Sequence, residues 1–152
     1  MAPETKKPGL LTVLLIILQI FLGLGGIGGG IAMLLDPSGA AMGLPPDLLD
    51  GLFIDSFLLP GLFLIAFMGL LPLLSAYCLW KAPTWSFPQR INPFQKQSLA
   101  WTLSLVLGLL LIGWILFQIL LWGSPIGIQI LYLVTGGLIT LLSMINRKEF
   151  QL

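Results

Sequence analysis

The chain has 152 residues, of which 57% are hydrophobic and only 9% are charged, and its mean hydropathy is +1.03. Seven basic and six acidic side chains give a net charge of +1 and cannot cover a water-soluble domain of this size with a polar surface. The composition therefore excludes a soluble globular protein and predicts an integral membrane protein surrounded mostly by lipid.

Four apolar stretches without a charged residue follow one another along the chain. They cover residues 10–35, 57–80, 98–122 and 126–145. A helix rises about 1.5 Å per residue, so each stretch can cross a hydrocarbon core of about 30 Å. We expect one membrane domain over residues 1–152, all-α, built as a transmembrane four-helix bundle with up-down-up-down topology. Residues 36–56 would form an outer loop and residues 81–97 a cytoplasmic loop.

The first stretch has a signal peptide as its alternative, because Lys6 and Lys7 precede an apolar run that ends in small residues. The run continues to Leu35, far beyond the roughly 7 to 15 residues of a signal-peptide core, and no clear cleavage site follows. We therefore favour an uncleaved membrane span.

The outer loop opens with the sequence Asp-Pro-Ser-Gly at residues 36–39, which is typical of a turn that ends a helix. Residues 45–53 suggest a short amphipathic helical turn with its leucines on the membrane surface. Asp55 or Ser56 is expected to cap the second span. Each acid then has a structural role, and we favour this over a cation site because the spacing matches no calcium loop.

The cytoplasmic loop combines three basic and three aromatic residues with three prolines. This composition suits a segment that lies in an anionic leaflet, and the same residues could dock a cytoplasmic partner. Cys78, near the cytoplasmic end of the second span, is expected to be a buried small residue, with palmitoylation as the alternative.

Glycine recurs at helical spacing inside the spans. The positions that we expect at helix contacts are Gly23, Gly26, Gly30, Gly69, Gly108 and Gly136. Apolar burial does not drive helices together in lipid, so close backbone approach at small residues has to do so, together with interhelical hydrogen bonds. We expect a dry, close-packed interior and no wide aqueous pore.

The glutamines are the strongly polar side chains inside the spans: Gln19 near the midplane, and Gln118 and Gln129 beside the turn between the third and fourth spans. With Asp36 and Asp55 in the loop nearby, these five residues form a candidate polar cluster near the outer surface. The alternative, which we favour, is that the glutamines serve as hydrogen-bond links between helices, worth roughly 0.6 to 2 kcal/mol per contact.

The basic residues predict the orientation. They are Lys6, Lys7, Lys81, Arg90, Lys96, Arg147 and Lys148, all on one side of a four-span bundle. The outer loop carries Asp36, Asp47, Asp50 and Asp55 and no basic residue. Because basic residues near short loops resist translocation, we expect both termini in the cytoplasm and a multi-pass location in the cell inner membrane.

Reactive groups are scarce. The chain has no His and a single Cys, and no acid lies inside a span. Metal ligation, a nucleophile activated by a histidine base and an intramembrane pair of carboxylates are therefore not expected. We predict no catalytic residue, no cofactor and no metal site.

The chain resembles a set of small four-span bacterial membrane proteins of uncharacterised function. The segments that carry this resemblance are Asp36–Gly39, Gly43–Pro45, the DSFLLPG sequence at 55–61, the WILFQ sequence at 114–118, and Gln129 with Tyr132. The resemblance implies an inner-membrane protein and adds no activity.

These observations favour a non-enzymatic scaffold or accessory subunit of a membrane complex. Its partners would be the lipid bilayer and either a second copy of the chain or another membrane protein, with no role for nucleic acid. The alternative is a small transporter or channel that acts as an oligomer, with Gln19, Gln118 and Gln129 along the path.

Overall fold

The computed structural model describes residues 8–52, 54–81, 89–123 and 127–151. The main helices are α1 (Leu10–Leu35), α2 (Leu58–Phe63), α3 (Leu71–Lys81), α5 (Leu99–Trp122) and α6 (Gly127–Ile145). A π-helical segment, η3 (Leu64–Leu70), joins α2 to α3, so that Leu58–Lys81 is one continuous helical span. In the described ranges, four helices are long and apolar enough to cross a membrane. The predicted all-α, four-helix fold is thus confirmed.

The helical spans agree closely with the predicted ranges. The second span begins and ends one residue later than expected, and α5 and α6 each begin one residue later. The fourth span continues beyond α6 through the 3-10 turn η4 (Asn146–Phe150). Ser98 caps the start of α5, because its hydroxyl oxygen accepts a 3.4 Å hydrogen bond from the Trp101 amide. Of the basic residues that predicted the orientation, Lys6 and Lys7 lie outside the described ranges, as does much of the cytoplasmic loop.

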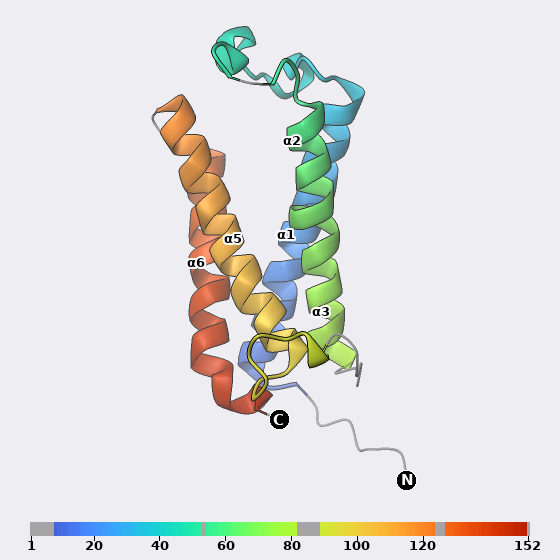
Figure 1. Cartoon of the computed structure of the whole chain (residues 1–152), viewed down its shortest axis with the longest axis vertical. Coiled ribbons are helices and arrows are strands. Elements are labelled where there is room, and N and C mark those ends of the chain that lie inside the picture. The colour runs from blue at the N-terminus through green and yellow to red at the C-terminus, as the bar shows by residue number, and fades with distance from the viewer. Residues whose placement is uncertain (1–7, 53, 82–88, 124–126, 152) are drawn as a thin grey trace.

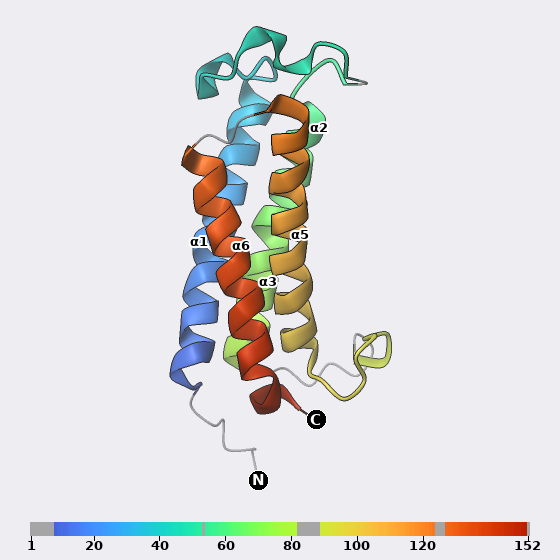
Figure 2. The ribbon, with the colours of Figure 1, turned by 90° about the vertical axis from the view of Figure 1, so that its left-hand side faces the viewer.

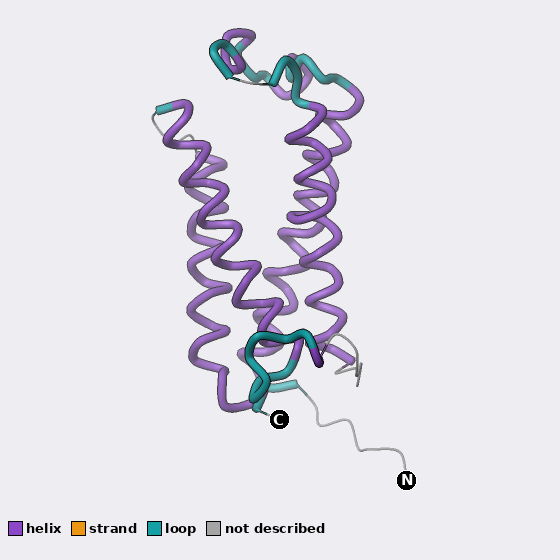
Figure 3. Tube along the Cα trace, viewed as in Figure 1, coloured by secondary structure: helices purple, strands orange, loops and turns teal. Residues whose placement is uncertain are grey.

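The bundle consists of two antiparallel pairs, α1 with the Leu58–Lys81 span and α5 with α6. The pairs lie close together at the end that contains the start of α1 and the turn η4, here called the terminal end. They diverge toward the loop of residues 36–57 at the other end, the loop end (Figures 1 and 3). Viewed from the side, α6 lies between α1 and α5 (Figure 2). At the terminal end the core is tightly packed, with Leu15, Leu107 and Ile139 fully buried.

Glycines form the contact between α1 and the second span. A Cβ atom on Gly30 would lie 2.5 Å from Ile65 Cγ1 and 2.7 Å from the Gly61 carbonyl oxygen. A Cβ on Gly26 would overlap the backbone carbonyl of Met68. Gly23 and Gly69 meet the opposite helix in the same way. The two backbones therefore approach as closely as glycine permits.

A second pair of glycines joins α5 to α6. A Cβ on Gly108 would overlap the Thr140 hydroxyl and lie 3.1 Å from the Gly136 carbonyl oxygen, and a Cβ on Gly136 would lie 3.0 Å from Ile112 Cγ1. All six glycines that the sequence indicated thus lie at contacts between helices.

The π-helical segment in the second span ends at Leu70, two residues before Pro72. Proline has no backbone N–H, so the Met68 carbonyl, four residues earlier, loses the donor that a regular α-helix would supply. Gly26 packs against this same carbonyl. A glycine Cα–H can act as a weak donor to a carbonyl at such a contact. The irregular segment and the glycine contact therefore occur at the same level of the bundle.

The loop of residues 36–57 contains two short 3-10 turns, η1 (Ala40–Met42) and η2 (Pro46–Leu49). Gly39 joins α1 to η1 with a φ of 77°, and a Cβ there would lie 2.9 Å from Phe57. The Phe57 amide donates to the Pro37 carbonyl over 2.9 Å, and the Phe57 side chain is buried. These contacts hold the two ends of the loop together.

One expectation about this loop is wrong. The residue that precedes α2 is Phe57 and not Asp55 or Ser56, and no side chain caps the helix, because the chain turns into the span one residue later. The expected short helical turn is present as η2, and Leu48 from this turn lines the space between the helix pairs.

Polar contacts tie the terminal end together. The Ser98 amide donates to the Phe150 carbonyl over 2.8 Å, and Gln97 pairs with Gln151 in an isolated β-bridge. Asn146 Nδ2 donates to Thr12 Oγ1 over 2.9 Å. The start of α1, the segment before α5 and the C-terminal turn are thus linked at this end.

Candidate functional site

A cleft of about 360 Å³ lies between the two helix pairs at the loop end. Helix α1 and η3 form one wall, α5 and α6 form the other, and the loop of residues 36–57 covers it. Its volume falls in the range of small-molecule binding sites, roughly 300 to 1,000 Å³. We therefore treat this cleft as the candidate functional site.

Two glycines of α1 lie on the first wall. Gly25 and Gly29 both line the cleft. A Cβ on Gly29 would find only Leu64 Cδ1 nearby, at 3.8 Å, whereas a Cβ on Gly25 would overlap the Tyr132 hydroxyl. The Gly25 and Gly29 face of α1 thus borders the cleft, while the Gly26 and Gly30 face packs against the second span.

The lining is mostly apolar. Met33, Met42 and Met68 contribute flexible thioether side chains, which adapt to irregular apolar ligands. Phe57 from the loop and Trp114 from α5 add aromatic surface. The Trp114 ring stacks on Phe63 with a centroid distance of 4.3 Å, which holds it against the second span.

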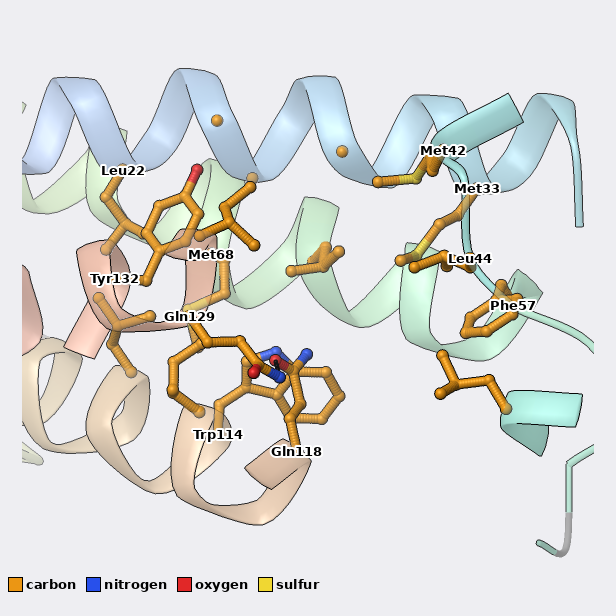
Figure 4. A pocket seen from close by; sticks show the side chains of 18 of the residues that line it. Leu22, Met33, Met42, Leu44, Phe57, Met68, Trp114, Gln118, Gln129 and Tyr132 are labelled. Atoms are coloured by element: carbon orange, nitrogen blue, oxygen red, sulfur yellow. Dashed lines mark hydrogen bonds between the residues drawn. The ribbon is translucent and has the colours of Figure 1, made fainter. Parts of the chain in front are cut away.

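Two amide side chains form the polar part of the cleft. Gln118 from α5 and Gln129 from α6 reach toward each other opposite α1 (Figure 4), and Gln129 Nε2 donates to Gln118 Oε1 over 3.4 Å. This distance lies beyond the usual range of an N–H···O hydrogen bond, so the bond is weak. The expected proximity of these two glutamines is observed.

Gln19 belongs to a different site, closer to the terminal end. Its Nε2 donates to Ser104 Oγ over 2.8 Å, and Ser104 also lies 3.3 Å from Ser75 Oγ. Gln19 is fully buried, and its Oε1 has no hydrogen-bond partner among the described residues. The interaction joins α1, α3 and α5 and matches the interpretation of Gln19 as a link between helices.

The two acids are not part of the cleft lining. Asp36 accepts hydrogen bonds from the Ser38 hydroxyl at 2.6 Å and from the Ala41 amide at 2.7 Å, and these bonds hold the pKa of its carboxyl below the ordinary value. Asp55 is exposed on the loop. The five residues of the candidate cluster therefore separate into an amide pair in the cleft, a buried helix link and two loop carboxylates.

The expectation of a close-packed interior holds at the terminal end but is wrong at the loop end. The helix pairs diverge there, and Gly29 has no side chain to fill the space between them. Sequence reasoning missed the role of the methionines and of Trp114 in the lining. One usable signal was Trp114 itself, which lies well inside a span where an interfacial tryptophan is not expected.

Metal binding is not indicated by the described residues, which contain no group of three or more His, Cys, Asp or Glu side chains placed to hold an ion. No protein-family model matches the chain, and no curated protein or solved structure shows significant similarity to it. What the cleft binds therefore has to be inferred from its lining and from its position in the bundle.

Proposed function

We propose that this protein is a non-enzymatic accessory protein of a membrane complex that binds the apolar chain of a membrane lipid in the cleft between its helix pairs. The observation that carries the proposal is an apolar cleft bordered by helices that are themselves long and apolar enough to span a bilayer. Lipid chains surround such a bundle, so they are present at very high local concentration.

Physical chemistry favours a lipid chain over water in this cleft. Water bound against methionine, leucine and aromatic side chains finds few hydrogen-bond partners there. An acyl chain moves from the bilayer into the cleft at no cost of dehydration, and it gains dispersion contacts with the walls. The three methionines can adjust to the position of such a chain.

The same lining supports a binding role and not a catalytic one. Among the described residues that border the cleft, the strongly polar side chains are Gln118, Gln129 and Tyr132. Amides are neither nucleophiles nor bases at neutral pH, and a phenol acts on a substrate only when a neighbouring group activates it. A bound lipid would then be carried or presented to another protein of the complex.

Transport along a row of glutamines receives no support from the geometry. Gln19 is fully buried between α1, α3 and α5 and does not border the cleft that holds Gln118 and Gln129. A path for a polar solute would have to pass the packed core around Leu15 and Leu107. We therefore favour the lipid-binding function over the transporter function.

Two neighbouring glycines of α1 offer a matched test. Gly29→Leu adds a side chain on the cleft side of α1, where a Cβ meets only Leu64 Cδ1 at 3.8 Å. Gly28→Leu adds the same side chain at an exposed position, where a Cβ meets no atom within 4 Å. The proteins would be placed in phosphatidylcholine nanodiscs that contain lipid with dibrominated acyl chains, which quench tryptophan on contact. Subtracting the signal of the Trp114→Phe variant of each protein isolates Trp114 in the cleft.

We expect Gly29→Leu to lower the quenching of Trp114 by about half or more, because the leucine takes up space that the chain requires. Gly28→Leu should behave as the unmodified protein, and the lipid shell around the bundle is common to both variants. Circular dichroism and size-exclusion chromatography check that both variants fold. Equal quenching in the two variants would show that no lipid chain enters the cleft.

A further inference from the structure

The chemical class of the lipid follows from the charges in and around the cleft, an inference that rests on the lipid-binding function proposed above. The described lining residues include no charged side chain. An ionised phosphate drawn into this lining would lose its water and find no cation to pair with, which is costly in a low-dielectric site. A polar group held inside the cleft therefore has to be neutral.

The amide pair provides a place for such a group. A glutamine amide carries both N–H donors and a carbonyl acceptor, so it can bind either a carbonyl or a hydroxyl oxygen. The bond between Gln129 Nε2 and Gln118 Oε1 is long, at 3.4 Å, so a ligand oxygen can replace it at little cost. Trp114 and Ile115, one turn before Gln118 on α5, also line the cleft and provide the apolar surface beside this pair.

The loop of residues 36–57, which covers the cleft, also selects against anionic lipids. The loop that provides Met42, Leu44 and Leu48 to the lining also carries Asp36, Asp47, Asp50 and Asp55, and it has no basic residue. The described basic side chains follow the second span, precede α5 or follow α6, all at the terminal end. An anionic headgroup at the loop end would therefore be repelled and would find no nearby cation.

We infer that the cleft selects an uncharged long-chain lipid whose polar end is a carbonyl or hydroxyl group, bound by Gln118 and Gln129, over anionic phospholipids. A diacylglycerol and a prenylated quinone share this chemistry. The acidic loop repels anionic headgroups, and the apolar walls bind the chain.

Lipids that differ only in the headgroup test this inference. Trp114 quenching would be titrated in nanodiscs with diacylglycerol and with phosphatidylglycerol that carry the same dibrominated stearoyl chains. We expect diacylglycerol to reach half of its maximal quenching at roughly tenfold lower mole fraction. Unlabelled diacylglycerol and unlabelled ubiquinone, each added as a competitor, distinguish a preference for hydroxyl from one for quinone carbonyl groups.

Matched glutamine variants test the role of the amide pair. Gln118→Met keeps the side-chain length but removes the amide, and it should weaken diacylglycerol quenching by about tenfold while phosphatidylglycerol quenching stays unchanged. Gln19→Met removes an amide that does not border the cleft and should leave the preference intact. If Gln118→Met and Gln19→Met weaken diacylglycerol quenching equally, the amide pair does not bind the polar group.

The two proposals fail in different ways. The two lipids could reach half-maximal Trp114 quenching at the same mole fraction, with Gly29→Leu still reducing the quenching by both. This result would overturn the selection for uncharged lipid and leave lipid binding in place. If Gly29→Leu leaves Trp114 quenching by both lipids unchanged, lipid binding in the cleft itself is overturned.

Discussion

Glycine has opposite roles on adjacent faces of α1. Gly26 and Gly30 bring the backbone of α1 against the second span, while Gly25 and Gly29 border the cleft and Gly28 meets no atom within 4 Å. Each pair has the same spacing of four residues in the sequence. Which pair makes a helix contact depends only on which face of α1 meets the neighbouring helix.

Gly26→Leu should destabilise the bundle. Its side chain would overlap the backbone carbonyl of Met68, which cannot move without displacing the second span. Overpacking of this kind costs about 1 to 3 kcal/mol. We expect a loss of about 3 kcal/mol in the free energy of unfolding, measured by titration with sodium dodecyl sulfate, and no comparable loss for Gly28→Leu. Equal stability of the two variants would contradict a close contact at Gly26.

At the scale of elements, the loop of residues 36–57 is an ordered cover for the cleft. Asp36 organises its start by accepting hydrogen bonds from Ser38 and Ala41, and Phe57 closes its end on the Pro37 carbonyl. The turn at residues 36–39 could be read from the sequence. The side chains that the loop places in the cleft could not, because their direction depends on how the loop folds back over α1.

This loop should lose order at acid pH. Hydrogen bonds from Ser38 and Ala41 hold the pKa of the Asp36 carboxyl below its ordinary value. The stabilisation by these bonds is therefore complete above the pKa of an unfolded aspartate, about 3.9, and is lost as the pH falls through the lower pKa of the folded protein.

The NMR chemical shift of the Ala41 amide would report this transition. We expect its midpoint to lie below about 3.9. The Asp36→Asn variant, which cannot titrate at this position, should show no transition at Ala41. A midpoint above that of an unfolded aspartate would be inconsistent with the hydrogen bonds to Asp36.

At the scale of the whole molecule, the two ends of the bundle differ in packing and in charge. The terminal end is closed by contacts such as those of Ser98 with Phe150 and of Asn146 with Thr12, and the loop end contains the cleft. The described basic residues lie at the first end, together with Glu149, and the four aspartates lie at the second. The distribution of basic residues supports our proposal that the terminal end, with both termini, faces the cytoplasm and the cleft lies in the outer leaflet of the inner membrane.

Cysteine labelling tests this orientation. In a Cys78→Ser background, we expect Ser38→Cys to react with a membrane-impermeant maleimide added to intact cells, because this residue is exposed at the loop end. Gln95→Cys, exposed at the terminal end, should react only after the membrane is permeabilised. The reverse pattern of labelling would invert the orientation.

The sequence by itself determined the four spans, the contact glycines and the expected direction of insertion. These properties are local, since hydropathy, helical spacing and the position of basic residues can each be read along a single segment. The sequence also indicated that Gln118 and Gln129 lie close together, because a short turn joins their helices.

Only the tertiary structure decided where space is left inside the bundle. The cleft exists because the α5 and α6 pair inclines away from α1 at the loop end, and the angle between two helix pairs depends on all their contacts at once. Gln19 lies closer to the terminal end, where the helix pairs are in contact, so it links helices and does not border the cleft that holds Gln118 and Gln129. Polar side chains inside the spans become one site only when they lie at the same level of the bundle and their helices turn these faces toward each other.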